Sequence, residues 1–188
     1  MFYGNIKNYD VADGVGVRVS LFVSGCRHHC KNCFQPQTWN FKFGKEFNEN
    51  TIKQILDMLK PDYISGLTLL GGEPFEPENQ QDLLWLVERV KLAYPQKNIW
   101  AYSGYKYEEL IGEKKCQLRF NNEQIALTHP RTEFTDKLLN LIDVLVDGEF
   151  VEELKDISLN FRGSSNQRII DLNETRKNGK VILHNLNN

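Results

Sequence analysis

The feature that most constrains the fold of this chain is a repeated alternation of short apolar segments with segments of helical periodicity. The strand-like segments are residues 17–23, 66–70, 98–102 and 143–146, with two later candidates at 167–172 and 180–184. The spacing of apolar residues predicts helices at residues 51–59, 78–93, 106–111 and 134–140. Strands separated by helices form parallel βα units, so the pattern predicts an α/β fold with a mostly parallel sheet.

Each of the first four strand-like segments is followed by an unusual loop. In order along the chain, these loops contain the sequences SGCRHHCKNC, GGEP, SGY and DGEF. In open α/β sheets, binding sites form beyond the carboxyl ends of the strands. The four loops are therefore predicted to converge on one site.

The remaining sequence sets outer limits on organisation and partners. The 188 residues fit a single domain, in which residues 113–133 lack clear periodicity and are interpreted as an insertion. A net charge of −2 offers no general basic surface for nucleic acid. No apolar run approaches the roughly 20 residues that cross a bilayer, and residues 1–10 lack the apolar core of a signal peptide. We therefore expect a cytoplasmic protein with no nucleic-acid or membrane partner.

Three of the four cysteines, Cys26, Cys30 and Cys33, lie within eight residues. Thiolates are soft ligands that suit iron–sulfur clusters and zinc. Three cysteines so close together can hold three irons of a cube-shaped cluster and leave the fourth iron open. An electron-carrying cluster would normally be closed by a fourth cysteine, so an open iron indicates a substrate site.

Two alternatives stay open on the cysteine spacing alone. One is a structural zinc ion with Cys116, His28 or His29 as its fourth ligand, in a binding module without catalysis. The other is an accidental cluster of thiols. The C-x3-C-x2-C spacing favours the iron–sulfur cluster over both, because zinc ribbons use paired C-x2-C arms.

The same spacing is the signature of the radical S-adenosylmethionine superfamily, which the chain resembles along most of its length. The sequence DGVGVR at 13–18 looks like the D-G-x-G-x-R stretch of glycyl-radical-enzyme activases, and GGEP at 71–74 matches the superfamily's G-G-E motif. Residues 24–39, 143–150 and 161–171 are similar to activases of anaerobic ribonucleoside-triphosphate reductase. One departure is Lys31-Asn32, where that family usually has Pro-Gly; Asn tolerates positive φ best among non-glycine residues, so Asn32 can keep the turn.

This resemblance implies a partial, open (β/α) barrel of the radical S-adenosylmethionine type. It implies a 4Fe-4S cluster on Cys26, Cys30 and Cys33 and S-adenosylmethionine at the open iron. Reductive cleavage would give methionine and a 5′-deoxyadenosyl radical, which would take hydrogen from a glycine of the reductase. A donor such as reduced flavodoxin would supply the electron. Activation of another glycyl radical enzyme, or a small-molecule reaction of the deazaguanine type, is the alternative; the sequence FRGSSNQR at 161–168 favours the reductase.

The resemblance also implies which residues contact the cofactor. These are Asn32, Phe34, Gly71, Gly72, Glu73, Pro74, Ser103 and Asp147. Each has a structural alternative: a strand-to-helix turn for the GGEP loop, a core aromatic for Phe34, a helix N-cap for Ser103 and an Asp-Gly turn for Asp147.

Five further residues are harder to assign. We expect His28 and His29 to be solvated loop side chains and Cys116 to lie outside the site. Arg162 and Arg168 flank a polar loop, which could bind the cofactor or the partner's backbone, or form an ordinary turn.

Overall fold

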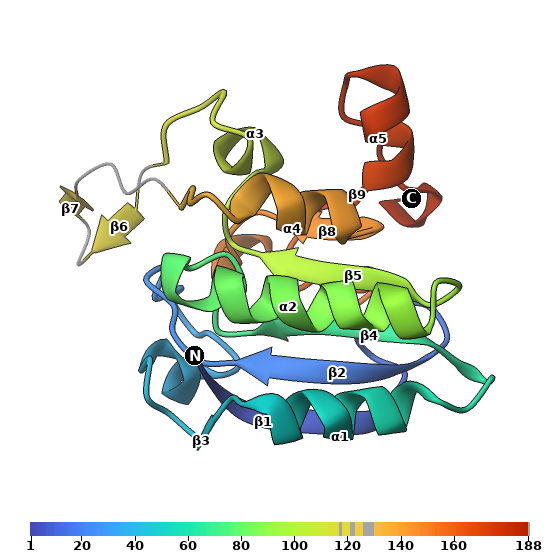
Figure 1. Ribbon diagram of the computed structural model, residues 1–188. Helices are drawn as coiled ribbons and strands as arrows, with labels where there is room; N and C mark the ends of the chain where they lie inside the picture. Colours follow the sequence, from blue (N-terminus) through green and yellow to red (C-terminus); the bar gives the residue numbers. More distant parts are fainter. Residues whose placement is uncertain (117, 121–122, 126–129, 188) are drawn as a thin grey trace.

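The computed structural model describes residues 1–116, 118–120, 123–125 and 130–187, and its described part is built around a seven-stranded open sheet (Figure 1). The strand order is β3-β1-β2-β4-β5-β8-β9. The strands are β1 (Phe2–Asp10), β2 (Val17–Val23), β3 (Lys45–Glu46), β4 (Ile64–Gly71), β5 (Asn98–Ser103), β8 (Val144–Asp147) and β9 (Arg168–Asp171). The four central strands β2, β4, β5 and β8 are parallel, and the outer pairings are antiparallel. This is the predicted α/β fold, with an open sheet consistent with a partial barrel.

Helices connect the parallel strands, as the sequence predicts. They are α1 (Glu49–Leu59), α2 (Pro77–Ala93), α3 (Tyr107–Leu110) and α4 (Thr135–Leu141). A fifth helix, α5 (Leu172–Asn178), follows the last strand of the sheet. Helix α1 begins after Asn48, whose side chain accepts hydrogen bonds from the backbone of Asn50 and Thr51 in a capping box. Helix α2 begins with Pro77, which needs no hydrogen-bond acceptor there.

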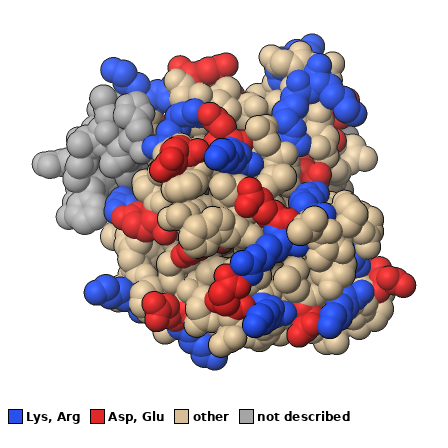
Figure 2. Space-filling model, viewed as in Figure 1, with Lys and Arg blue, Asp and Glu red and all other residues tan. Residues whose placement is uncertain are grey.

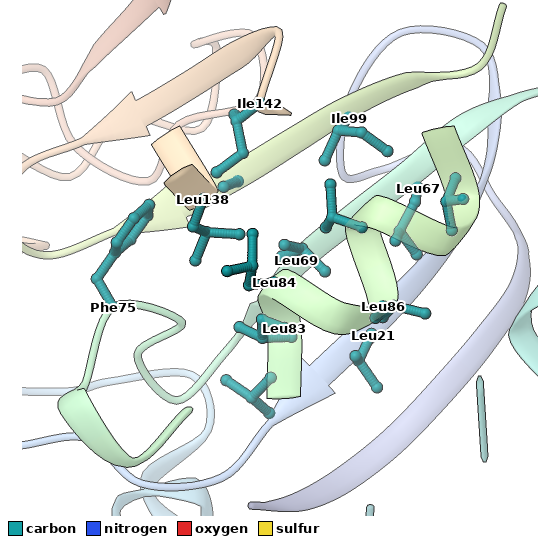
Figure 3. Close-up of a cluster of buried hydrophobic side chains, with 14 of the residues drawn as sticks. Leu21, Leu67, Leu69, Phe75, Leu83, Leu84, Leu86, Ile99, Leu138 and Ile142 are labelled. Atoms are coloured by element: carbon teal, nitrogen blue, oxygen red, sulfur yellow. The ribbon is translucent and has the colours of Figure 1, made fainter. Parts of the chain in front are cut away.

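The two faces of the sheet differ in character because successive strand residues point to opposite sides. On one face, alternate residues such as Leu21, Leu69 and Ile99 join Leu83 and Leu86 of α2 in the main hydrophobic core (Figure 3). The intervening residues on the other face are more polar or aromatic, and they include Arg18, Ser20, Thr68, Trp100 and Tyr102. The first face provides the core, and the second leaves room for a site.

Most predicted elements are confirmed to within one or two residues, and the errors lie at the edges of the sheet. Strand β1, the two-residue β3 and helix α5 were not predicted. Residues 180–184 were predicted as a strand, which is wrong: they contribute one isolated bridge, from Leu183 to Ile170. The segment is short and pairs with an outer strand, so few ladder hydrogen bonds can form.

The expected insertion at 113–133 contains a small antiparallel hairpin of β6 (Leu118–Phe120) and β7 (Glu123–Ile125), which projects away from the main sheet (Figure 1). Residues 117, 121–122 and 126–129 lie outside the described residues. Cys116 is buried in the main core. Among the described helices, none combines the length and apolarity needed to cross a bilayer.

Candidate functional site

A cavity of about 510 Å³ opens beyond the carboxyl ends of the parallel strands. Its wall includes residues from each of the four loops that follow β2, β4, β5 and β8: Cys26, Cys30, Cys33, Phe34, Gly71, Gly72, Glu73, Ser103, Gly104, Gly148 and Phe150. The predicted convergence of the four loops is therefore confirmed. The cavity continues along the polar face of the sheet, past Phe22, Leu70 and Tyr102, to Asp13.

All three clustered cysteines line this cavity. Cys26 is buried, whereas Cys30 and Cys33 are half-buried. The loop bends through positive φ angles at Gly25, His29 and Asn32, and the value of +58° at Asn32 agrees with the turn predicted for it. A side chain at Gly25 would come within 2.4 Å of Phe41, so glycine allows the close approach.

The thiols of this triplet are held in a poorly solvated environment. Burial, followed by the charge of Glu73, raises the pKa of Cys26 far above its ordinary value. Burial, followed by the charge of Glu149, raises the pKa of Cys30 to about 12. Both thiols therefore stay protonated until a positively charged group arrives, and metal binding must release protons.

The donor set suits an iron–sulfur cluster, because cysteine thiolates are the usual ligands of such clusters. Cys26, Cys30 and Cys33 come from one loop and all line one cavity. In a cluster, each thiolate binds a different iron. Three sulfurs around one cavity thus match a cube held at three corners.

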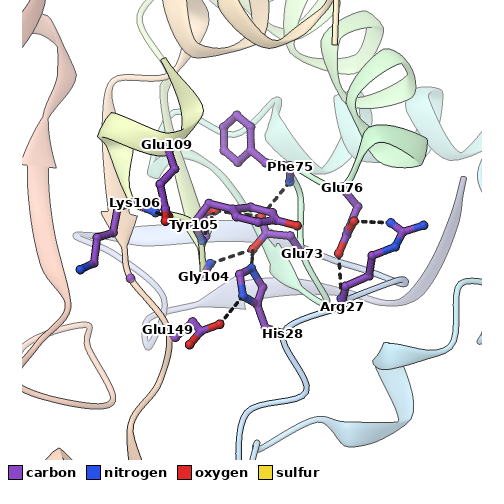
Figure 4. A network of polar contacts seen from close by, with 12 residues as sticks. Arg27, His28, Glu73, Phe75, Glu76, Gly104, Tyr105, Lys106, Glu109 and Glu149 are labelled. Carbon is purple, nitrogen blue, oxygen red and sulfur yellow. Dashed lines mark hydrogen bonds and ion pairs between the residues drawn. The ribbon is translucent and has the colours of Figure 1, made fainter. Parts of the chain in front are cut away.

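Glu73 joins three of the loops through its carboxylate (Figure 4). Its Oε1 accepts hydrogen bonds from Phe75 N at 2.8 Å and Ser103 Oγ at 2.9 Å. Its Oε2 accepts one from Gly104 N at 2.7 Å and lies 3.2 Å from His28 Nε2. A carboxylate has about four acceptor positions; three of those of Glu73 accept hydrogen bonds from the protein, and the His28 ring lies beside the same carboxylate. The side chain shapes the site, and the backbone of Gly71 and Gly72 is the part left to face a ligand.

His28 is buried, so the expectation of a solvated side chain is wrong. It is 5% exposed, donates from Nδ1 to Glu149 at 2.7 Å, and packs 4.3 Å from the Tyr105 ring. Burial alone would lower the pKa of His28, but hydrogen bonding to Glu149 and then to Glu73 raises it to about 10. We therefore assign a charged imidazolium that links the cysteine loop to the loops after β4 and β8. A side chain at Gly104 would come within 2.6 Å of this ring.

Arg27 fixes the other side of the cysteine loop. Its backbone N–H donates to Glu76 at 2.7 Å, and its guanidinium contacts the Glu76 carboxylate (Figure 4). The guanidinium also pairs with Glu78 in the first turn of α2. The guanidinium also lies 4.4 Å from the centre of the Phe41 ring. The loop that carries the cysteines is thus held by charged groups on both flanks.

The remaining sequence-predicted contacts occupy different positions. Phe34 is 72% exposed at the cavity mouth, which excludes the core-aromatic alternative. Asn32, Pro74 and Asp147 are not among the described residues that line the cavity. Asp147 is buried and accepts hydrogen bonds from Arg168 at 2.5 and 2.9 Å and from Tyr107 N at 2.7 Å.

The polar loop between Arg162 and Arg168 is held mainly by its own hydrogen bonds. Gln167 accepts from Gly163 N and Ser164 N and donates to Gly148 O. Arg162 lines the cavity and donates to Gln167 O and to Asn187. Sequence analysis missed Gln167 and Asn187, because neither belongs to a pattern of spacing.

The far end of the cavity is built by the DGVGVR stretch. Arg18 is fully buried and donates to Thr68 Oγ1 at 2.6 Å and to Val15 O at 3.2 Å. Thr68 in turn donates to Asp13 O at 2.8 Å. Burial, followed by a hydrogen bond and repulsion from Asp10, raises the pKa of Asp13 to about 7. The stretch therefore anchors its loop to the sheet and places one carboxyl group at the cavity.

Comparisons with known proteins agree with this geometry. Residues 12–170 match the family described as a 4Fe-4S single cluster domain. The chain is 37% identical over 169 residues to the anaerobic ribonucleoside-triphosphate reductase-activating protein of Enterobacteria phage T4, covering 90% of this chain and 93% of that relative. It is 41% identical over 162 residues to the protein of that name from Haemophilus influenzae, covering 85% and 91%. The Escherichia coli K12 protein is 39% identical over 169 residues, covering 89% and 96%.

The family match includes the four loops that converge on the cavity and the parallel strands that carry them. The cluster domain named by the family match needs soft ligands, and the cavity supplies three cysteine sulfurs on one wall. The chain therefore belongs to the family of anaerobic ribonucleoside-triphosphate reductase-activating proteins, built on a 4Fe-4S single cluster domain.

Proposed function

We propose that this chain is an oxidoreductase that activates anaerobic ribonucleoside-triphosphate reductase by generating a glycyl radical on it. The observation that carries the proposal is the position of Cys26, Cys30 and Cys33 on one cavity wall, beyond the ends of the parallel strands. This site lies in a chain 37–41% identical to relatives that bear the activase name.

The three cysteines would hold the 4Fe-4S cluster and leave one iron open for S-adenosylmethionine. When bound, these groups supply one-electron cleavage to methionine and a 5′-deoxyadenosyl radical, which takes a hydrogen atom from glycine. The protein's own residues bind, orient and exclude water. Phe22, Leu70 and Tyr102 give the inner wall an apolar lining that suits this last task.

Among the expected cofactor contacts, the arrangement supports direct roles for Gly71, Gly72, Ser103 and Phe34, which line the cavity. Glu73 also lines it, but its carboxylate is occupied by protein donors, so we assign it to orientation of the loops. Asn32, Pro74 and Asp147 do not line the cavity, so we assign them supporting roles. Asn32 acts through its turn and Asp147 through its ion pair with Arg168, and Pro74 belongs to the loop that precedes α2.

The protein partner is the reductase, because the hydrogen donor is a glycine within it. Reduced flavodoxin, or a donor of similar potential, would deliver the electron, and the cytoplasm would keep the thiols reduced. Nothing observed favours the zinc-stabilised module, since the family match is to an iron–sulfur domain. The single-domain organisation over 1–188 stays a prediction.

The first test compares Cys30→Ala with Cys116→Ala after anaerobic reconstitution with iron and sulfide. Cys30 lines the cavity, whereas Cys116 is buried in the core. We expect Cys30→Ala to lose labile sulfide, 5′-deoxyadenosine formation and the glycyl radical signal in electron paramagnetic resonance. Cys116→Ala should keep its cluster. Wild-type cofactor cleavage by Cys30→Ala would refute the ligand assignment.

A further inference from the structure

The mouth of the cavity carries apolar side chains that the protein leaves in water. Ile157 is 95% exposed and Phe34 is 72% exposed, and both line the cavity. Phe150 packs 5.6 Å from the Phe34 ring, and the Lys155 ammonium lies 5.4 Å from the centre of that ring. We call these four residues, Phe34, Phe150, Lys155 and Ile157, the mouth patch.

Three of the four residues belong to segment 150–163, which is held at its base and not at its tip. The base is fixed by a bridge between Lys155 and Ser164 and by a hydrogen bond from Ser165 N to Leu154 O. Within the described structure, the hydrogen bonds of residues 157–160 run from Ser158 and Leu159 to Asp156. The tip therefore places the exposed side chain of Ile157 beside the cavity, and the hydrogen bonds of the tip stay within its own segment.

Other described surfaces differ from the mouth patch. Over α1 and α2, lysine, arginine, aspartate and glutamate side chains are interspersed, as expected for a solvated face (Figure 2). Leu92 of α2 is 86% exposed but lines neither of the two cavities. Tyr9 is exposed and lines the second cavity, but its ring stacks on Tyr63 at 6.2 Å. At the mouth patch, exposed apolar side chains lie beside the cavity that also contains the three cysteines.

We propose that the mouth patch is the docking surface for the glycine-bearing segment of the reductase. This inference rests on the proposed function, which requires a partner glycine to reach the cavity. A cavity of about 510 Å³ is of the size that holds one small-molecule ligand, so only a narrow part of the partner can enter beside the cofactor. The mouth patch is continuous with that cavity. Exposed apolar side chains grouped in this way are typical of a surface that binds another protein.

The chemistry of the patch defines the occupant. The occupant is an extended segment with glycine at the reacting position, an apolar neighbour that covers Ile157, and a carbonyl or carboxylate oxygen for Lys155. Lys155 has no ion pair within the described residues, although the nearby Lys31 pairs with Glu153 at 3.1 Å. The partner thus supplies the oxygen that Lys155 lacks in this chain.

The experiment measures two reactions of the same reconstituted enzyme. Partner-free formation of 5′-deoxyadenosine with a chemical reductant reports the cluster and cofactor site. Glycyl radical formation, titrated with the purified anaerobic reductase encoded in the same genome, reports docking. Ile157→Asp should raise the half-saturating reductase concentration about tenfold or more and change partner-free cleavage less than about twofold. Leu92→Asp, the matched control on α2, should change neither reaction.

The outcomes separate this inference from the proposed function. An unchanged half-saturating concentration for Ile157→Asp, or an equal rise for Leu92→Asp, overturns the docking surface. Loss of partner-free cleavage in both Ile157→Asp and the milder Ile157→Ser also overturns it, because Ile157 would then belong to the cofactor site. A wild-type enzyme that cleaves the cofactor but gives no glycyl radical at any reductase concentration refutes the proposed function instead.

Discussion

The two faces of the sheet bury different kinds of side chain, although the same strands build them. On the helical face, residues such as Leu21, Leu69 and Leu86 are fully buried and contact other apolar side chains. On the opposite face, Arg18 and Thr68 are equally buried, but each makes specific hydrogen bonds. Burial of apolar groups is tolerant of detail, whereas burial of polar groups requires every partner to be in place. The helical face therefore provides stability, and the polar face provides a site.

The largest expected effect comes from the helical face. Leu86→Ala should lower the free energy of unfolding by about 2–5 kcal/mol, because it removes a fully buried side chain and leaves a cavity. Urea unfolding of the anaerobic protein measures the change. The exposed Leu92 is the control, and Leu92→Ala should stay within about 0.5 kcal/mol of the wild type. Equal losses in the two variants would contradict the assignment of the core to this face.

A smaller effect on stability, with a larger effect on chemistry, is expected beside the cysteine loop. A side chain at Gly104 would come within 2.6 Å of His28, so Gly104→Ala must displace the imidazolium from between Glu73 and Glu149. Such overpacking costs about 1–3 kcal/mol. Partner-free formation of 5′-deoxyadenosine should fall as well, because the loops that carry the cysteines and the glycines lose their common link.

A double-variant cycle checks the cause of that loss. If the clash with His28 is responsible, the effects of His28→Ala and Gly104→Ala on unfolding will not add, because the first change removes the ring that the second one hits. Strict additivity would show that Gly104 acts through another contact.

The smallest effect is expected at the far end of the polar face. The pKa of Asp13 is raised to about 7 from its ordinary value of 3.8, so the folded protein holds a proton that the unfolded chain has lost between these two values. The contribution of Asp13 to the free energy of unfolding is therefore fully present below about pH 4 and is lost as the pH rises through 7. Asp13→Asn should remove this decrease of the free energy of unfolding with pH. It should stabilise the protein at pH 8 by about 1 kcal/mol, a value that allows for the partial solvation of the carboxyl group.

Unfolding measured from pH 5 to 8 checks this prediction. The neighbouring Asp10 must be considered as a second group that could titrate. Burial would raise the pKa of Asp10, but hydrogen bonds to Asp13, Lys7 and Ser20 lower it, so its contribution changes only at more acidic pH. An unaltered slope between pH 5 and 8 in Asp13→Asn would show that another group titrates there.

The sequence alone determined the parts of this protein that depend on local patterns. Apolar periodicity predicted the four parallel strands and the helices between them, and the position of each chemical loop after a strand predicted a shared site. Three cysteines within eight residues predicted a ligand set, and the structure places all three in the wall of the shared cavity. These inferences succeed because strand and helix periods, and the geometry of parallel units, are properties of short segments.

Only the tertiary structure decided the state of individual polar groups and of the sheet edges. His28 is buried because Glu149, 121 residues away, and Glu73 meet it, and Asp147 is occupied because Arg168 lies on the neighbouring strand. Strand β1 forms by pairing with β2 over much of its length, whereas 180–184 meets the short strand β9 at one bridge. The physical reason is common to all of these cases: solvation, ion pairing and edge pairing depend on groups distant in the sequence, which no local pattern contains.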